Sequence, residues 1–454
     1  MKKNYEMDMC NGRILGKMLK FAIPLMLSSM LQLLFNAADL VVIGKYGKEY
    51  GVSAVGSNAA LINLLTNLFI GLSIGANVLV ARYYGAKSNE ELSETIHTSM
   101  LLSLLCGIVL AVTGVIFARD FLVLMRVPKE VIGLATTYLR IYFLGMPAMM
   151  VYNFGSAILR AIGDTKRPLY FLMAAGVINV ALNMLLVIVF RLDVAGVGIA
   201  TVVSQTISAV LIFICLMKNK GTVKLLLSLL RIHKRKLIDI LKIGIPAGLQ
   251  GVIFALSNVV IQSSVNLFGP DVIDGNSAAQ NIEGFVYFSM NAFYHATLSF
   301  TGQNMGGGKY DRIPKILIRG QLCAITFGLV VGYAAIFAGR FLLSIYVDNP
   351  AAIDAGITRL KIISGSYILC GIMDVMVGAI RGIGYTVLPT VVSLIGACAL
   401  RLVWLATVFQ IPEYHTINTV YLSYPITWAV TIIAHIICYF IIRHKNPAFR
   451  KEII

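Results

Sequence analysis

The chain has 454 residues, of which 58% are hydrophobic and 13% are charged, and its formal net charge is +17. So large an apolar share excludes a soluble globular protein and is typical of a polytopic membrane protein. The positive charge does not indicate a nucleic-acid partner. Lys and Arg gather in the termini and in alternate loops between apolar segments, as the positive-inside rule describes. Both termini are therefore expected in the cytoplasm.

Apolar segments separated by short polar loops predict an all-α integral membrane protein with twelve transmembrane helices. The polar, basic residues 1–20 argue against a cleavable secretory signal. The seven cysteines include no CxxC pair, so we expect no disulfide, no structural metal and no cofactor. The predicted spans are residues 20–44, 52–80, 93–117, 132–158, 168–190, 195–217, 240–267, 275–302, 315–339, 355–380, 388–409 and 419–442.

The first apolar segment, residues 21–44, contains a single charged residue, Asp39. An acid within a transmembrane segment is costly and usually faces the protein interior or a wet cavity. Gln32 and Asn36 precede Asp39 at helical spacing, so all three are expected on one helix face. Pro24 leaves one helix carbonyl without its partner and favours a kink, which predicts a hinge. We interpret Asp39 as functional. The alternative is that it lies near the helix end and reaches the membrane interface.

The two halves of the chain repeat one another. KFAIP at residues 20–24 recurs as KIGIP at 242–246, and the pattern R-x-x-G-x-T-x-x-P occurs at 160–168 and at 381–389. Each half has six predicted spans, so both halves start on the same side of the membrane and the repeat is parallel. We therefore predict two pseudo-symmetric six-helix bundles, 1–217 and 242–454. They are joined by a basic cytoplasmic linker, 218–241, that contacts anionic lipid headgroups.

These repeats, together with the sequence GQNMGGG at residues 302–308, resemble the multidrug and toxic compound extrusion (MATE) family over nearly the whole chain. The resemblance implies a cation-coupled antiporter rather than an enzyme. Protons or sodium ions enter while amphiphilic, often cationic compounds leave through a V-shaped cleft between the two lobes. It also implies a monomer in the bacterial cytoplasmic (inner) membrane.

By the same resemblance, Asp39, Asn179, Asn183 and Thr201 match positions of a cation site in the N-terminal lobe. A carboxylate with amide and hydroxyl oxygens can coordinate Na⁺, and the same carboxylate can instead take a proton. Some relatives carry an acid where Asn183 stands, so Asp39 is the sole titrating group expected here, and no metal other than Na⁺ is expected. The alternative for the two asparagines is interhelical hydrogen bonding.

The C-terminal half departs from the family pattern. Phe254 and Cys370 stand where some relatives carry an acid, so an ion site of that type is not expected in this lobe. We interpret Glu283, Asp374 and Arg401 as the intramembrane charges of this half. Because an unpaired arginine at this depth is costly, we expect an acidic partner for Arg401, and depth slightly favours Glu283 over Asp374.

Two histidines, His295 and His435, also lie inside predicted spans and are expected to be hydrogen-bonded interior residues. Arg160 and Arg381 are expected to anchor helix ends at the cytoplasmic interface.

Two other functions fit the sequence less well. A flippase for lipid-linked sugars of the same superfamily would need several arginines near its anionic cargo, and the predicted spans of the first half contain only one, Arg140. A membrane-embedded enzyme is disfavoured because the chain has no H-E-x-x-H motif. Its single G-x-S-x-G match, at residues 71–75, lies inside the predicted span 52–80 and not at a strand-to-helix turn.

Overall fold

The computed structural model describes residues 5–47, 50–219, 221–446 and 449, which form helices joined by turns and irregular segments, with no strand. The contacts divide them into two compact units. The N-terminal unit contains the described residues up to Asp8 and Leu27–Val252. The C-terminal unit contains Met9–Met26 and the described residues from Ile253 onward. The extreme termini, predicted to be cytoplasmic, lie outside the described residues.

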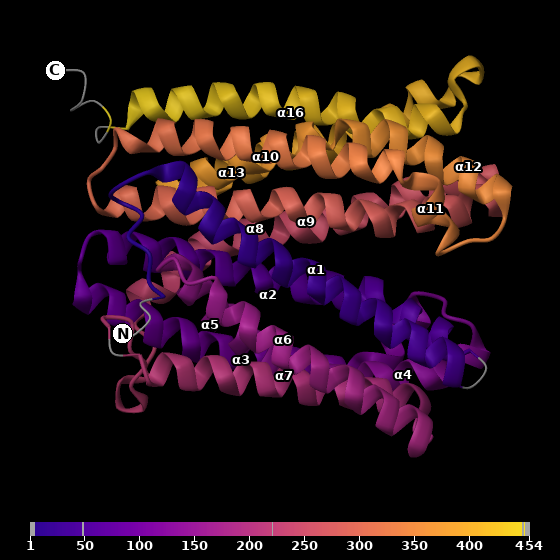
Figure 1. Ribbon diagram of the computed structural model, residues 1–454, viewed down its shortest axis with the longest axis horizontal. Helices are drawn as coiled ribbons and strands as arrows, with labels where there is room; N and C mark the ends of the chain where they lie inside the picture. Colours follow the sequence, from indigo (N-terminus) through magenta and orange to yellow (C-terminus); the bar gives the residue numbers. More distant parts are fainter. Residues whose placement is uncertain (1–4, 48–49, 220, 447–448, 450–454) are drawn as a thin grey trace. The chain divides into compact units, whose positions relative to one another are not determined.

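In the N-terminal unit, α2, α3 and α5 pack against one another and α7 packs against α5 and α6 (Figure 1). A break at Gly145, followed by Pro147 in the first turn of α5, bends α4 and α5 by 47° within one predicted span. The helices of this unit are α2 (Gly51–Gly85), α3 (Asn89–Leu124), α4 (Lys129–Leu144), α5 (Met146–Ala161), α6 (Lys166–Asn183) and α7 (Asp193–Met217).

In the C-terminal unit, α9, α10 and α13 pack side by side, and α16 packs against α13 (Figure 1). The helices that start in this unit are α9 (Pro270–Gly306), α10 (Arg312–Phe337), α11 (Gly339–Ser344), α12 (Pro350–Arg359), α13 (Gly365–Ile383), α14 (Val387–Ser393), α15 (Leu400–Ala406) and α16 (Ile417–Lys445). Three π-helical segments widen the helix turn in the two units: η1 (Met184–Val189) after α6, η4 (Leu360–Ser364) after α12, and η5 (Leu394–Ala399) before α15.

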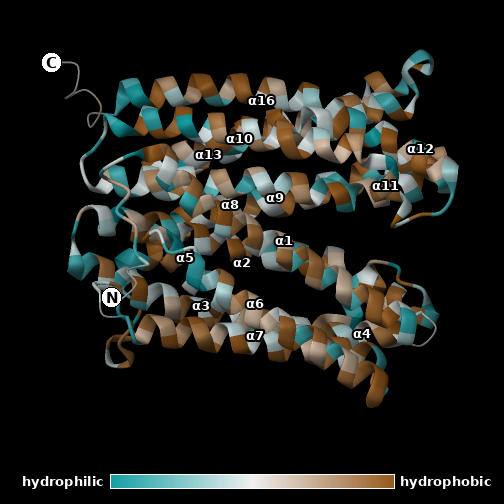
Figure 2. Ribbon diagram, in the orientation of Figure 1, coloured by the Kyte–Doolittle hydropathy of each residue, from teal (hydrophilic) through white to brown (hydrophobic). Residues whose placement is uncertain are grey.

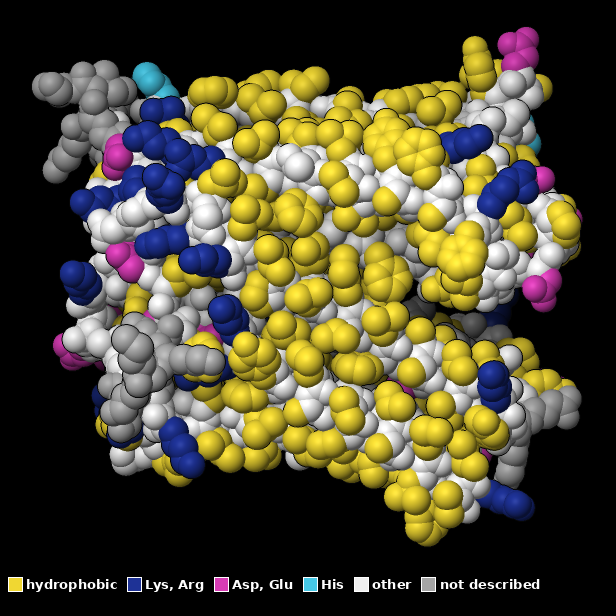
Figure 3. Space-filling view, in the orientation of Figure 1, with side chains coloured by type: hydrophobic (Ala, Val, Ile, Leu, Met, Phe, Trp, Pro, Cys, Tyr) yellow, Lys and Arg dark blue, Asp and Glu magenta, His cyan; other side chains and the backbone are white. Residues whose placement is uncertain are grey.

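Within the described residues, ten helices are long and apolar enough to cross a membrane, and the bent pair α4–α5 makes an eleventh. The remaining predicted span, the eighth (275–302), corresponds to α9, which has 37 residues but is not among the apolar spans. Hydrophobic residues cover much of each helix (Figure 2), and Lys and Arg side chains gather toward helix ends (Figure 3). The chain is therefore a multi-pass membrane protein, and α9 is more polar than its other spans.

Two helices are shared between the units. α1 (Ile14–Tyr46) contains Pro24 and passes from the C-terminal to the N-terminal unit after Met26. α8 (Lys234–Val265) contains Pro246 and changes unit after Val252. The predicted boundaries at 217 and 242 differ from this division, because a short segment at the start of each repeat packs with the other unit. Residues 234–241, predicted as linker, are the first turns of α8.

The first half of α8 is held against α2 by a close crossing of glycines. Gly71 and Gly75 on α2 face Gly244 and Gly248 on α8, and a Cβ at Gly71 would overlap the backbone of Gly248. Small residues four apart allow such backbone contact between membrane helices. This crossing explains why the start of the second repeat belongs to the N-terminal unit.

The repeated signature R-x-x-G-x-T-x-x-P marks the turn between two helices in each unit. Gly163 follows α5 with φ +87°, and Gly384 caps α13 with φ +112°, a backbone conformation that favours glycine. In the turn between α5 and α6, Asp164 accepts hydrogen bonds from the backbone and side chain of Arg167. Burial raises the pKa of Asp164, although Arg167 opposes this shift. The glycine of the signature is thus explained by turn geometry.

The linker that precedes α8 is bound to the start of α3. The His97 ring, 1% exposed, accepts a hydrogen bond at Nε2 from the Leu226 backbone (3.0 Å), while Nδ1 donates to the Ser93 carbonyl (2.7 Å). His233 Nδ1 lies 3.1 Å from Glu94 Oε1. The linker is therefore attached to α3 through its residues Leu226 and His233.

Candidate functional site

The candidate site lies in the N-terminal unit, where Asp39 on α1 meets α6 and α7. Asp39 is 8% exposed and Asn183 is fully buried. Asn183 Nδ2 donates hydrogen bonds to Asp39 Oδ1 and to Asn179 Oδ1, the latter at 3.2 Å. Thr201 Oγ1 donates to the Val197 carbonyl (2.9 Å) and lies 3.4 Å from Asp39 Oδ2. The structure thus brings together the four residues Asp39, Asn179, Asn183 and Thr201.

Local helix geometry places these side chains. Asn179 and Asn183 are one turn apart on α6, so both amides face the same way. Asn183 is the last residue of α6 before the π-helical segment η1, and π-helical turns often occur at functional sites. Among the described residues the Oδ1 of Asn183 is buried without a hydrogen-bond partner. A buried carbonyl oxygen of this kind is available to a ligand.

The oxygens around Asp39 suit a small monovalent cation. The two carboxylate oxygens, the amide oxygens of Asn179 and Asn183 and the hydroxyl of Thr201 are hard ligands. The described residues contain no cluster of three or more His, Cys, Asp or Glu side chains that could hold a metal ion. The site therefore offers one titrating carboxylate among neutral oxygens, which can bind either a proton or Na⁺.

Two tyrosines on α4 were not expected at this site. Tyr138 and Tyr142 lie close enough to Asp39 to interact with its charge, and their ring centroids are 5.9 Å apart. The spacing of four residues places both on one face of α4. That spacing was visible in the sequence, but nothing in it linked the fourth span to the first.

The other residues predicted on α1 lie apart from this cluster. Gln32 and Asn36 are exposed, whereas Asp39 is buried. The hydrogen bonds found for Asp39 come from α6 and α7 instead. Pro24 is buried within a continuous α1, three residues before the helix enters the N-terminal unit. The polar face predicted from spacing therefore contributes only Asp39 to the cluster.

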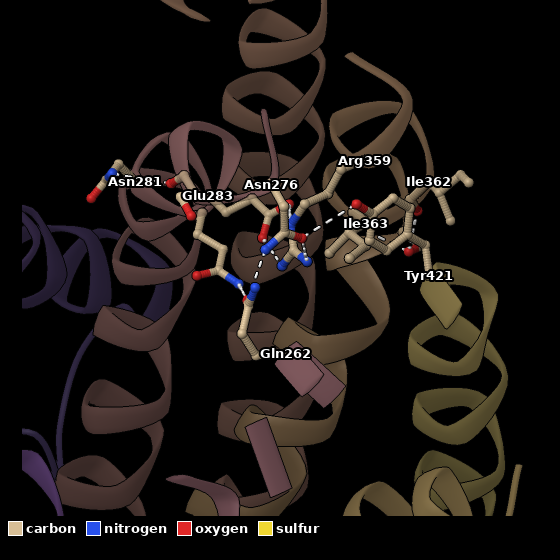
Figure 4. Close-up of polar contacts among 11 residues, drawn as sticks. Gln262, Asn276, Asn281, Glu283, Arg359, Ile362, Ile363 and Tyr421 are labelled. Carbon is tan, nitrogen blue, oxygen red and sulfur yellow. Dashed lines mark hydrogen bonds and ion pairs between the residues drawn. The ribbon is translucent and has the colours of Figure 1, made fainter. Parts of the chain in front are cut away.

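Glu283 has a different partner from the one predicted. Figure 4 shows it beside Arg359, which lies at the end of α12. Arg359 Nε and Nη2 donate to the two Glu283 oxygens at 3.0 and 2.8 Å, and Nη1 donates to Asn276 Oδ1 at 2.7 Å. Arg359 is 3% exposed and Glu283 is 2% exposed. The prediction that Glu283 binds Arg401 is wrong, because α12 rather than α15 packs against α9.

Arg401 and Asp374 also make other contacts than predicted. The Arg401 guanidinium lies over the ring of Tyr424, with its carbon 3.9 Å from the centroid. Asp374, which is half-buried, is within hydrogen-bonding reach of Asn291 and Tyr287. The second predicted partner of Arg401 is therefore not bound to it either.

Arg381 and His435 are interior residues of the C-terminal unit. Arg381 is buried and donates to Tyr294 and Thr390, each at 3.0 Å, so it ties α13 to α9 and α14. His435 is fully buried and hydrogen-bonded to Ser393 at 3.1 Å, which confirms the prediction for this histidine.

Comparison with known proteins decides the family. The MatE family model matches the chain twice, at residues 24–185 and 246–407, which correspond to the two predicted repeats. The chain belongs to the MatE family. Members of this family are transporters, so the protein is a transporter rather than an enzyme. The double match confirms both the predicted resemblance and the division of the sequence into two repeats.

Relatives and solved structures extend this result over the whole chain. It is 31% identical over 397 residues to the probable multidrug resistance protein YpnP of Bacillus subtilis, covering 87% of this chain and 88% of the relative. It is 29% identical over 423 residues to the probable multidrug resistance protein YoeA of the same organism, covering 91% and 90%. An outward-facing multidrug resistance MATE family transporter has the same fold, with a TM-score of 0.90 at 20% identity, covering 99% and 100%.

Proposed function

We propose that this MatE transporter exports small amphiphilic, often cationic compounds in exchange for a monovalent cation that binds at Asp39. The observation that carries the proposal is the Asp39 carboxylate, buried in a transmembrane helix and bound to Asn183 and Thr201 rather than to a basic residue. A carboxylate without a cationic partner at this depth is costly while it is charged. It is therefore suited to bind and release a cation. The names of the relatives support multidrug compounds as the cargo.

We propose a proton rather than Na⁺ as the coupling ion. The amide nitrogen of Asn183 donates to oxygens of both Asp39 and Asn179, so an NH₂ group occupies the space between these oxygens. A sodium ion bound by the same oxygens needs this amide to turn around, because a cation cannot be coordinated by N–H donors. A proton can add to Asp39 Oδ2, whose only described hydrogen bond is the 3.4 Å contact with Thr201.

The experiment is dye transport in inside-out vesicles with ΔpH and a sodium gradient imposed separately. We expect ΔpH to drive uptake by the wild-type protein and a sodium gradient at constant pH to drive none. Asp39→Asn should insert normally and lose the ΔpH-driven transport. Asp120→Asn, at the exposed end of α3, is the control and should transport normally. Normal transport by a well-expressed Asp39→Asn protein overturns the proposal, and uptake driven by sodium alone overturns the choice of ion.

The distribution of positive charge supports a location for the protein. We propose that it is a monomer in the bacterial cytoplasmic membrane with both termini in the cytoplasm. The excess of Lys and Arg in the termini and in the linker before α8 supports this orientation.

A further inference from the structure

Arg401 is buried in the hydrophobic core of the C-terminal unit. It lies on α15, directly after the π-helical segment η5, and is 3% exposed. Its guanidinium carbon is 3.9 Å from the ring centroid of Tyr424 and 5.8 Å from that of Trp428, both on α16. Tyr424 and Trp428 belong to a cluster of buried apolar residues that also includes Cys370 and Leu405. Arg401 thus places a permanent positive charge among apolar side chains.

The charge has no acidic partner in the part of the chain that the structure describes. None of the ion pairs found there, at distances up to 4.0 Å, involves Arg401. Glu283 is occupied by Arg359 through two hydrogen bonds. Of the five N–H donors of the Arg401 guanidinium, one on Nη2 binds Thr427 Oγ1 at 3.1 Å. The Nε is buried and has no hydrogen-bond partner.

Contact with the aromatic rings does not balance this arrangement. Attraction between a cation and an aromatic face is smaller than the cost of removing a guanidinium from water. In addition, a ring face is a weaker acceptor for the Nε–H group than an oxygen or an anion is. A second donor, Ser257 on α8, is beside the Cys398 thiol, and Cys398 precedes Arg401 by three residues and interacts with its charge. Its hydroxyl oxygen is buried without a hydrogen-bond partner among the described residues.

We propose that Arg401 is the centre of an internal anion site in the C-terminal unit. The ligand is a monovalent anion, either chloride or the carboxylate group of a transported compound. It accepts hydrogen bonds from Arg401 Nε and from the Ser257 hydroxyl, and its charge offsets that of the guanidinium. A neutral or cationic ligand has no corresponding acceptor for these donors. The site is separate from Asp39 and does not depend on the identity of the coupling ion.

One internal group could take the place of the anion. Cys370 lies near both Asp374 and Arg401, so the Asp374 carboxylate could approach Arg401 if it left Asn291 and Tyr287. In that case the charge of Arg401 is balanced within the protein and no anion binds. The experiment below separates these two cases.

The chain contains two tryptophans, Trp404 and Trp428, so Trp404→Phe leaves Trp428 as a single probe beside Arg401. Iodide quenches indole fluorescence on contact. We expect iodide quenching of the Trp404→Phe protein to saturate, and chloride, but not gluconate, to compete with it. The saturable component should be lost in Trp404→Phe/Arg401→Gln and kept in Trp404→Phe/Arg401→Lys, because lysine keeps the charge. Competition by acetate at equal ionic strength indicates that the site also accepts carboxylates.

Several results overturn the proposal. One is iodide quenching of the Trp404→Phe protein that does not saturate. Another is saturable iodide quenching that remains in Trp404→Phe/Arg401→Gln. Saturation that arises only after Asp374→Asn shows instead that Asp374 is the counter-charge. If Arg401→Gln does not fold, the thermal unfolding of the Trp404→Phe protein decides. A higher unfolding temperature in chloride than in gluconate supports the anion site, and equal temperatures contradict it.

Discussion

Arg359 and Glu283 form a buried, two-pronged ion pair, with Nε–Oε1 at 3.0 Å and Nη2–Oε2 at 2.8 Å. The pair joins α12 to α9, and Asn276 accepts a third hydrogen bond from the same guanidinium. Each charge is stable at this depth only because the other is present. The pair therefore fixes the end of the tenth predicted span to the eighth.

Removing one member of this pair should be costly. We expect Glu283→Gln to lower the free energy of unfolding by about 3–5 kcal/mol, because Arg359 is left charged and buried without a counter-charge. The double variant Glu283→Leu/Arg359→Met should lose less than Glu283→Gln alone. Thermal unfolding of the purified protein measures both. The exposed pair Arg340–Asp354 is the control, and Asp354→Asn should cost less than about 1 kcal/mol. Equal losses in Glu283→Gln and Asp354→Asn contradict this account.

The glycine crossing of α2 and α8 should not tolerate a side chain. Gly71→Ala puts a methyl group into the backbone of Gly248, and we expect a loss of about 1–3 kcal/mol from the displaced helices. Gly56→Ala, on the same helix, is the matched control because nothing lies within 4 Å of its Cβ. Gly56→Ala should leave stability unchanged or raise it slightly. Thermal unfolding of both variants tests the crossing, which is disproved if they behave alike.

The linker before α8 should depend on His97. We expect His97→Leu to leave the Leu226 N–H without its acceptor and to expose the linker to trypsin, which can cut at Lys224 and Arg231. Limited proteolysis followed by mass spectrometry measures the cleavage rate at these two sites. His444→Leu, at the exposed end of α16, should not change that rate. A linker cleaved equally fast in the wild-type and His97→Leu proteins means that the ring does not hold it.

Pro24 should affect transport more than stability. Pro24→Ala restores a backbone donor that the helix lacks, so the fold should be unchanged or more stable, while transport slows if α1 bends there as it passes between the units. Pro425→Ala, within α16 of the C-terminal unit, is the control and should leave the transport rate unchanged. Initial rates of dye efflux measure the difference. An unaltered rate in Pro24→Ala shows that Pro24 is not a hinge for transport.

The sequence could predict what depends on composition and spacing. The helical membrane fold, the two repeats and the sharing of one face by Asn179 and Asn183 follow from apolar periodicity and helix geometry. It could not predict which helices are neighbours. Depth alone made Arg401 a plausible partner of Glu283, whereas the packing of α12 against α9 brought Arg359 there instead. The sequence did not single out Arg359, because this residue lies near the end of its predicted span, where arginines are common.

The sequence also does not show which residues of α1 contact neighbouring helices. Spacing put Gln32, Asn36 and Asp39 on one face, but only Asp39 contacts residues of α6 and α7. Asp39 is therefore buried, whereas Gln32 and Asn36 are exposed. The glycines of the crossing were present in the sequence, but their partners become known only when α2 and α8 are placed together.

Exchange of a cationic compound for a proton at Asp39 requires that binding of the compound displaces the proton. The decisive measurement adds a cationic fluorescent dye to the purified protein in weakly buffered solution and records the pH. We expect proton release on dye binding by the wild-type protein, no release by Asp39→Asn, and no effect of sodium on either. Dye binding without proton release at any pH between about 5 and 9, or equal release by Asp39→Asn, would contradict it.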